Sequence, residues 1–354
     1  MSNRVFMKGT EAVAEAAIRA GCRFFAGYPI TPQNEVPEYF ARKMPEVNGI
    51  FLQGESEVAS ANMLYGGAAS GTRSMTSSAS CGISLMSEAI SWLALSNLPA
   101  VICNFQRGGP GIGSIQPAQQ DYIQATKAMG NGGFQMIVLA PNSVQEAADM
   151  TYEAFELADK YLHPVVVLLD GFLGTMMEPV TFMPAKTEEE VVEMKAKKTW
   201  VPNGNKTGFH RVFMRHLNDI QLCNQEAADM YKGWKTTETS YETYLTNDAE
   251  LIITAYGIAS RICQSVVERM RKEGYKVGMI RPKRLNPFPE EAFENLKYEN
   301  LKGILSVEMS IPEQYGVDVK IAVANRCKLD YCLTSGGTIL DAEDIYKKAL
   351  AFFV

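Results

Sequence analysis

The fold class of this sequence is decided by one stretch, MIVLAPNSVQEAADMTYEAFELADKYLHPVVVLL, which occupies residues 136–169. Two short apolar runs of strand composition, 136–140 and 164–169, flank a helical pattern at 144–157 that opens with Asn142-Ser143. Strands that are joined through a helix pair in parallel, by a right-handed crossover. The stretch therefore predicts a β-α-β unit in a parallel sheet whose two faces are covered by helices.

The same alternation of apolar strands and helices fills the chain from its start to about residue 175. Further strands are predicted at 23–26, 49–52, 73–76 and 99–103, and helices at 10–20, 57–69 and 83–97. Together with the two strands above, these elements predict a three-layer α/β domain over residues 1–175.

The rest of the chain divides into a connector and a second α/β domain. Residues 176–249 lose the apolar rhythm, with a charged segment at 187–198 expected to be a solvated helix or extended chain, and an exposed turn at 203–208. The rhythm then returns over residues 250–354. Strands are predicted at 251–255, 277–280 and 303–307, and helices at 259–272 and 342–352. These elements predict a second, smaller domain.

Composition and charge exclude several classes of protein. The 354 residues are 46% hydrophobic and 21% charged, which is the usage of a folded globular protein. A net charge of −6 gives no general attraction to nucleic acid or to anionic lipid. The sequence has no signal-peptide core and no apolar segment of membrane-spanning length, so we expect a cytoplasmic protein that binds neither nucleic acid nor membrane.

Metal and redox centres are not expected within this chain. Its seven cysteines are scattered, which matches neither a disulfide framework nor the spacing of zinc or iron–sulfur ligands. Its three histidines are too few for a histidine-rich metal site. Any redox centre must therefore be carried elsewhere.

The loops that follow the strands are the first places to look for a site, because ligands of parallel α/β sheets collect beyond the carboxyl ends of the strands. Motifs for dinucleotides, P-loop phosphates, serine nucleophiles and H-E-x-x-H zinc are absent. The first loop, Gly27-Tyr28-Pro29-Ile30-Thr31-Pro32, holds Thr31 between two prolines, and Pro32 is expected in the first turn of the next helix. Thr31 is then either presented to a ligand or a helix cap in a rigid connection.

A second loop, Gln53-Gly54-Glu55-Ser56-Glu57, places two carboxylates at the start of a small, apolar helix. One interpretation is favourable charge placement at the positive end of the helix dipole. Glu57 differs from Glu55 because it begins the tightly packed part, where a desolvated carboxyl can hold a proton or share one with a ligand nitrogen.

A third loop, Asn104–Gly113, is rich in glycine and has Arg107 at its base. Such a loop can bring backbone amides and a guanidinium to an anion. Lys127 lies on the helix that follows. Each of these two basic residues is either an anion-binding group or a surface charge.

In this order the loops resemble a definite family. Tyr28-Pro29-Ile30-Thr31-Pro32, Glu57 with Gly66, and Arg107-Gly108-Gly109-Pro110-Gly111 resemble the pyrimidine-binding chain of the thiamine-diphosphate-dependent 2-oxoacid:ferredoxin oxidoreductases. Residues 281–289 and Val307-Glu308-Met309 are similar to that family's transketolase-C-like domain. Among the branches, Gln106–Gly111 with Gln116-Pro117 resembles most the alpha-type subunit of the 2-oxoisovalerate enzymes, and the 2-oxoglutarate enzymes have a similar chain.

The resemblance implies a role for each candidate residue. Glu57 would hydrogen-bond N1′ of the aminopyrimidine and favour the imino tautomer that removes the C2 proton of thiamine. Tyr28, Pro29 and Ile30 would also bind the cofactor, and Thr31 would lie near the thiamine ring or the substrate carboxylate. Either Arg107 or Lys127 would meet that carboxylate; where relatives carry arginine near position 127, the lysine would be a departure.

The resemblance also implies an enzyme that is complete only with partners. The chain lacks a G-D-G element followed by asparagine, so Mg²⁺ and the diphosphate would be held by a beta-type subunit, and gamma-type and ferredoxin-like subunits would carry the iron–sulfur clusters. The assembled enzyme would oxidise a 2-oxoacid to acyl-coenzyme A and CO2 and pass electrons to ferredoxin. Alone, the chain is expected to form an inactive homodimer.

Two other classes remain open at this point. One is the pyrimidine subunit of a different thiamine enzyme, such as a transketolase or a dehydrogenase that feeds lipoamide, against which Tyr28–Pro32 argues. The other is a non-catalytic assembly protein of the same fold, which would keep the sheet without needing Glu57.

Overall fold

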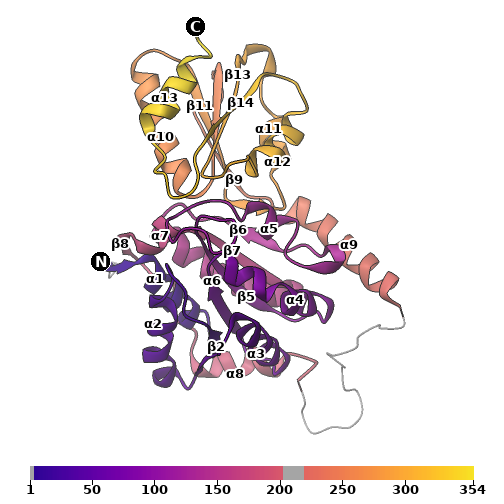
Figure 1. Ribbon diagram of the computed structural model, residues 1–354. Helices are drawn as coiled ribbons and strands as arrows, with labels where there is room; N and C mark the ends of the chain where they lie inside the picture. The colour runs from indigo at the N-terminus through magenta and orange to yellow at the C-terminus, as the bar shows by residue number, and fades with distance from the viewer. Residues whose placement is uncertain (1–3, 202–218) are drawn as a thin grey trace.

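The computed structural model describes residues 4–201 and 219–354, which form two parallel sheets with helices on both faces of each (Figure 1). Six strands of the larger sheet pair in parallel, and one edge strand is antiparallel. Across the sheet the order is β12 (Arg284–Asn286), β6 (Ile137–Leu139), β7 (Pro164–Asp170), β5 (Ala100–Gln106), β4 (Ser74–Ser78), β2 (Phe24–Gly27) and β3 (Ile50–Gln53). The prediction of a parallel α/β domain is confirmed.

Helices cover the two faces of this sheet because its central strands are apolar on both sides. In β5, Val101 and Cys103 belong to one core cluster, whereas Ala100 and Ile102 belong to the other. The first face is covered by α1 (Gly9–Arg19), α2 (Glu35–Lys43) and α6 (Val144–Tyr161), and the second by α3 (Glu57–Ala69) and α4 (Cys81–Leu95). Shorter helices are η1 (Met44–Val47), α5 (Tyr122–Thr126), η2 (Asn131–Gly133) and α7 (Gly171–Thr175).

The second sheet is smaller and again mostly parallel, as predicted. Its strand order is β14 (Leu329–Leu333), β13 (Gly303–Glu308), β10 (Leu251–Thr254), β11 (Val277–Pro282) and β9 (Tyr241–Tyr244), of which β9 is antiparallel. Around it lie α10 (Gly257–Lys272), α11 (Glu290–Glu294), η3 (Tyr298–Asn300), α12 (Tyr315–Val323) and α13 (Ala342–Leu350). The edge strand β9 comes from the expected connector, whose limits remain a prediction.

The two sheets are joined by an exchanged strand and by buried charge. β12 follows β11 in the chain but pairs with β6 at the edge of the first sheet, where Arg284 makes 2.6 Å ion pairs with Glu153 and Glu238. At the end of β7, the Asp170 carboxylate accepts a 2.9 Å hydrogen bond from the N–H of Ile258, in the first turn of α10. Burial raises the pKa of Asp170 to about 6.

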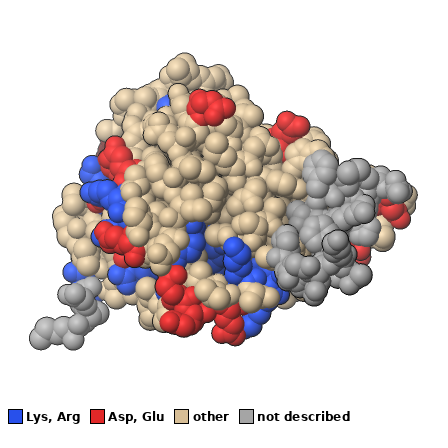
Figure 2. All heavy atoms as spheres, turned by 90° about the horizontal axis from the view of Figure 1, so that it is seen from below, with Lys and Arg blue, Asp and Glu red and all other residues tan. Residues whose placement is uncertain are grey.

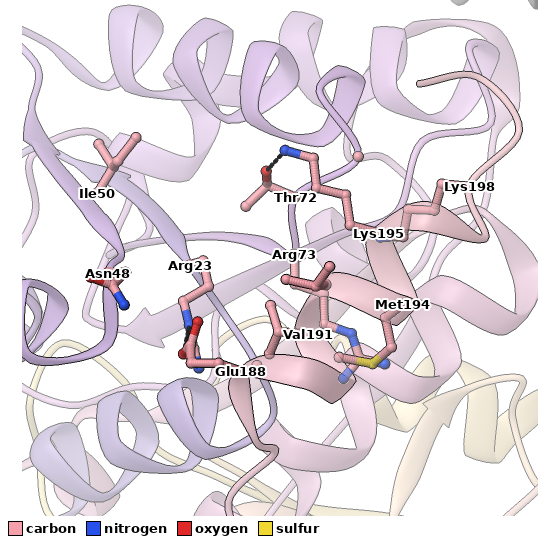
Figure 3. A pocket seen from close by; sticks show the side chains of 13 residues that line it. Arg23, Asn48, Ile50, Thr72, Arg73, Glu188, Val191, Met194, Lys195 and Lys198 are labelled. Carbon is pink, nitrogen blue, oxygen red and sulfur yellow. Dashed lines mark hydrogen bonds and ion pairs between the residues drawn. The ribbon is translucent and has the colours of Figure 1, made fainter. Parts of the chain in front are cut away.

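The helices of the expected connector pack against the amino ends of the first sheet, whereas its strand β8 (Met177–Val180) lies near the carboxyl ends, where Glu178 accepts a 2.8 Å hydrogen bond from the N–H of Val144 at the start of α6. Within the connector, β8 pairs with β1 (Val5–Lys8), and α8 (Glu188–Ala196) and α9 (Ile220–Thr237) follow. Arg23 pairs with Glu188 at the start of α8, beside a cavity of about 260 Å³ (Figure 3). Figure 2 shows acidic and basic side chains side by side on this end of the molecule.

Segment 187–198 was expected to be a solvated helix or an extended chain. It is mostly helical, as α8, but it is not fully solvated. The Lys198 side chain is 7% exposed, and its Nζ lies 2.9 Å from Asp159. The expected turn at 203–208 lies outside the described residues. No helix in the described part of the chain has the length and apolarity to cross a membrane.

Candidate functional site

The three candidate loops follow β2, β3 and β5 and meet at the carboxyl edge of the first sheet, next to the start of α4. Arg107 connects them, because its Nη1 donates a 2.9 Å hydrogen bond to the Thr31 carbonyl and its Nη2 a 3.2 Å bond to Cys81 Sγ. The residue after Cys81 is Gly82, and a Cβ added there would lie 2.7 Å from Glu57 Oε1. The structure therefore brings Thr31, Arg107 and Glu57 into one site through the first residues of α4.

The turn that carries Thr31 is held by a buried glutamine. The backbone N–H of Gln33 donates to the Ile30 carbonyl at 3.0 Å, and its side-chain amide donates to the Tyr28 carbonyl at 3.4 Å. The Ser77 hydroxyl on β4 donates to the Gln33 amide oxygen. Thr31, Tyr28 and Pro29 are thereby left exposed on a fixed backbone. Pro32 precedes α2 and does not lie in its first turn as expected.

Glu57 is the first residue of α3 and is 7% exposed, whereas Glu55 is exposed in the preceding loop. Ser56 caps the helix by accepting a 3.2 Å hydrogen bond from the Ala59 N–H. Within residues 4–201 and 219–354 the Glu57 carboxylate has no hydrogen bond or ion pair. A buried carboxyl without a partner is costly unless a ligand donates to it or it holds a proton.

A second unpartnered oxygen lies beside Glu57. Ser78, the last residue of β4, is fully buried, and its hydroxyl has no partner among the described residues. A Cβ at Gly82 would lie 2.1 Å from this hydroxyl as well as 2.7 Å from Glu57. Only a glycine at this position lets Glu57 Oε1 and Ser78 Oγ lie so close to the start of α4 and to each other.

Arg107 is not a surface charge, because it is 6% exposed. Besides Thr31 and Cys81, it donates from Nη2 to the Ile112 carbonyl at 3.0 Å, so the glycine-rich loop curls over it. Three of its five N–H groups thus have acceptors, and the buried Nε has none within the described residues. The remaining donors suit an anion.

Lys127 occupies a different place. It follows α5, and its Nζ makes a 2.8 Å ion pair with Asp318 on α12 of the second domain. The Tyr122 hydroxyl donates to the same carboxylate. Of the two basic candidates, Arg107 is the one that contacts the turn carrying Thr31.

Three polar residues beside Arg107 were not among the sequence candidates. Ser80, Asn104 and Asp121 are buried and hydrogen-bonded to one another. Burial raises the pKa of Asp121, although the hydrogen bonds from Ser80 and Asn104 oppose this effect. The run Ser77-Ser78-Ala79-Ser80 after a strand was the available signal, but its partners lie more than 20 residues away in the sequence.

Comparison with known proteins identifies the relatives of this chain. Residues 15–243 match the family model described as pyruvate flavodoxin/ferredoxin oxidoreductase, thiamine diphosphate-binding, and residues 249–345 match pyruvate:ferredoxin oxidoreductase core domain II. Ketoisovalerate oxidoreductase subunit VorB of Methanothermobacter thermautotrophicus is 42% identical, over 97% of this chain and 96% of its own length. 2-Oxoglutarate synthase subunit KorA of the same organism is 30% identical, over 99% of each chain.

One solved structure supports the fold independently. The 2-oxoglutarate:ferredoxin oxidoreductase from Magnetococcus marinus, with 2-oxoglutarate, coenzyme A and succinyl-CoA bound, matches with a TM-score of 0.85 at 24% identity. The match covers 100% of this chain and 66% of that one, so this chain spans about two thirds of the length of that protein.

Proposed function

The chain belongs to the family of pyruvate flavodoxin/ferredoxin oxidoreductases, and from that premise we propose that it is the subunit that binds the thiamine ring in an enzyme oxidising 2-oxoisovalerate. Its relatives are subunits of 2-oxoacid:ferredoxin oxidoreductases, and this chain is such a subunit, active together with partner subunits. Thiamine diphosphate is the cofactor of the matched domain. These facts set aside the non-catalytic assembly protein of the same fold.

The residues present fit the pyrimidine end of that cofactor. Among the described residues Glu57 is a buried carboxyl without a partner and Ser78 a buried hydroxyl without a partner, and both oxygens lie close against the backbone of Gly82. An aminopyrimidine offers ring nitrogens and an amino group to such oxygens. The described residues contain no group of three or more histidine, cysteine or acidic side chains arranged to hold a metal ion.

We assign the proton-handling role to Glu57. Bound thiamine diphosphate supplies the nucleophilic carbon that attacks the 2-oxo group and the electron sink for decarboxylation. Glu57 would hydrogen-bond N1′ of the pyrimidine, and its burial would exclude the water that competes for this hydrogen bond. Tyr28, Pro29, Ile30 and Thr31 form the fixed turn against which the cofactor is held.

The substrate carboxylate is assigned to Arg107, with Thr31 beside it. Arg107 already bonds the Thr31 carbonyl, so its charge lies at the turn, and its unpaired N–H groups remain for an anion. A buried guanidinium binds a carboxylate more strongly than an exposed one because less solvent screens the pair. Lys127 is the weaker candidate because Asp318 already neutralises it.

The choice of 2-oxoisovalerate rests on the relative of 42% identity, a ketoisovalerate oxidoreductase subunit. The loop over Arg107 supports it, because Ile112 and Ile115 are 81% and 57% exposed and suit a branched apolar side chain. 2-Oxoglutarate is the second candidate, favoured by the relative of 30% identity. That substrate would need a second cation for its distal carboxylate.

The partners are proposed because this chain has no G-D-G element for the diphosphate and Mg²⁺ and no cysteine clusters for iron–sulfur centres. A beta-type subunit would hold the diphosphate and Mg²⁺, and gamma-type and ferredoxin-like subunits would carry the iron–sulfur clusters. Coenzyme A would accept the acyl group. Alone, the chain would form a homodimer without 2-oxoacid oxidation.

Coexpression with its partner subunits tests this proposal. The complex is assayed with a panel of 2-oxoacids, coenzyme A and a viologen dye, with Glu57→Gln and Glu55→Gln as matched variants. We expect the highest kcat/KM with 2-oxoisovalerate, a loss of about 10²-fold or more for Glu57→Gln, and little change for the exposed Glu55→Gln. Equal effects of the two variants would contradict the assignment of Glu57. Preference for 2-oxoglutarate would contradict the substrate, and activity of the isolated chain would contradict the need for partners.

A further inference from the structure

Asp121 is a buried carboxyl that the proposed chemistry does not use. It is 8% exposed and lies just before α5, at the end of the segment that follows the glycine-rich loop. Its Oδ2 accepts a 2.6 Å hydrogen bond from the Ser80 hydroxyl and a 3.0 Å bond from the Asn104 side-chain amide. Its own backbone N–H donates to the Gln106 side-chain oxygen at 3.2 Å.

Ser80 joins this carboxylate to the backbone of Arg107. The Ser80 hydroxyl lies 3.1 Å from the Arg107 carbonyl oxygen and accepts a 2.9 Å hydrogen bond from the Arg107 N–H. The Ser80 N–H donates to the Asn104 side-chain oxygen at 3.0 Å. One serine thus links the backbone N–H of Arg107 to the Asp121 carboxylate.

Ser80 itself is held in an unfavourable backbone conformation. Its φ is +29° and its ψ is −85°, in the region where a side chain is disfavoured. Ser80 precedes Cys81 and Gly82, which contact Arg107 and lie against Glu57. The surrounding hydrogen bonds must hold this conformation, and the side chains of Asp121 and Asn104 supply two of them.

We propose that Asp121 is a positioning residue, which acts through Ser80 and Asn104 to hold Arg107 and the first residues of α4 in place for the substrate. The proposal rests on the proposed function for the role of Arg107 at the substrate carboxylate. The hydrogen bonds that connect Asp121 through Ser80 to the Arg107 backbone do not depend on that role. A carboxylate suits this task because it accepts from two donors at once and fixes the direction of each.

The test uses the assembled complex with Asp121→Ala and Asp121→Asn. Asp159→Ala is the matched control, because Asp159 also makes partly buried ion pairs, with Arg73 and Lys198, at the opposite end of the sheet. Amide hydrogen exchange of residues 106–114 reports the loop directly, since the amides of Arg107, Gly108, Gly109 and Ser114 are hydrogen-bonded. Steady-state KM for the 2-oxoacid reports the substrate site.

We expect Asp121→Ala to speed exchange of this segment about 10-fold or more and to raise KM by roughly 10-fold, with a smaller change in kcat. Asp121→Asn keeps one acceptor oxygen, so its exchange rate and its KM should lie between those of wild type and Asp121→Ala. Asp159→Ala should lower the melting temperature and leave exchange of residues 106–114 and KM unchanged. In an Arg107→Ala background, Asp121→Ala should raise KM no further, because it acts through the same residue.

The proposal is overturned if Asp121→Ala leaves amide hydrogen exchange of residues 106–114 unchanged. It is also overturned if the double variant raises KM by the product of the two single effects, because the two residues would then act independently. If Asp159→Ala speeds exchange of the loop as much as Asp121→Ala does, then Asp121 only contributes to the stability of the whole chain, and the proposal is overturned. If Arg107→Ala leaves KM unchanged, the proposed substrate contact fails, and exchange alone then decides whether Asp121 positions the loop.

Discussion

Adding one methyl group at Gly82 is expected to inactivate the assembled enzyme without unfolding the chain. Gly82 lies in the first turn of α4 with a φ in the ordinary range, so alanine fits its backbone. In an unobstructed helix, Gly→Ala stabilises by up to about 1 kcal/mol. Here the new Cβ would lie 2.7 Å from Glu57 Oε1 and 2.1 Å from Ser78 Oγ.

The size of the effect follows from those distances. Ordinary contact begins at 3.4 Å, so the Glu57 carboxylate must retreat by about 0.7 Å and the Ser78 hydroxyl by about 1.3 Å. Glu57 can move because it is the end of a flexible side chain, whereas Ser78 is a short side chain on a buried strand, so we expect the helix to be kept at some cost in melting temperature. A displacement near 1 Å at a catalytic group costs about 10²-fold in rate.

The assay compares Gly82→Ala with Gly233→Ala, whose Cβ in α9 would meet nothing within 4 Å. Melting temperature of the isolated chain measures stability, and turnover of the complex with saturating thiamine diphosphate measures catalysis. We expect both variants to fold, and Gly82→Ala alone to lose about 10²-fold in kcat. Turnover of Gly82→Ala within about 3-fold of wild type would refute the placement of Glu57 at the reacting cofactor.

Arg107→Ala should raise the KM for the 2-oxoacid by about 10-fold or more, and Lys127→Ala should change it little because Asp318 already pairs with the lysine. A rise of KM for the lysine variant alone would assign the substrate carboxylate to Lys127. Burial raises the pKa of Glu308 from 4.5 to about 7, so the folded chain keeps a proton that the unfolded chain loses near pH 4.5. Glu308 should therefore contribute about 3 kcal/mol less to the free energy of unfolding at pH 7 than at pH 4.5, and the difference between wild type and Glu308→Gln in urea titrations should fall by that amount over this range. Gly66→Ala should leave the isolated chain as stable as wild type, because a Cβ there meets nothing within 4 Å; a clear loss of melting temperature would contradict this packing of α3.

Local pattern was enough to predict most of the regular elements. The predicted strands at 23–26, 99–103 and 164–169 correspond to β2, β5 and β7 within a few residues, because each is an apolar run that lies between two helical layers. The contrast between Glu55 and Glu57 was also accessible, since Glu57 opens the small-residue helix and becomes buried where that helix packs.

Contacts between distant segments could not be predicted from local pattern. The partner of Lys127 is Asp318, 191 positions away, and no local feature distinguishes a lysine that is paired from one that is free. β12 has only three residues and joins the sheet of the other domain, which neither its length nor its composition indicates. Ser80 and Asp121 belong to the same class, because burial gives them their role and burial is set by the whole fold.

The second domain has a direct part in shaping the substrate side of the site. Gln119, fully buried, follows the glycine-rich loop, and its backbone N–H donates to the Met309 carbonyl at 2.8 Å. Its side-chain oxygen accepts a 3.1 Å hydrogen bond from the Met309 N–H, and its side-chain amide donates to the Tyr256 carbonyl at 3.0 Å. Gly337 lies so close to Gln116 that a Cβ would approach it to 2.4 Å. The loop over Arg107 is therefore fixed from within this chain, between Asp121 on one side and the second domain on the other. We accordingly expect exchange of this chain between related enzymes to transfer the KM for the 2-oxoacid, and exchange of a beta-type partner to leave it largely unchanged.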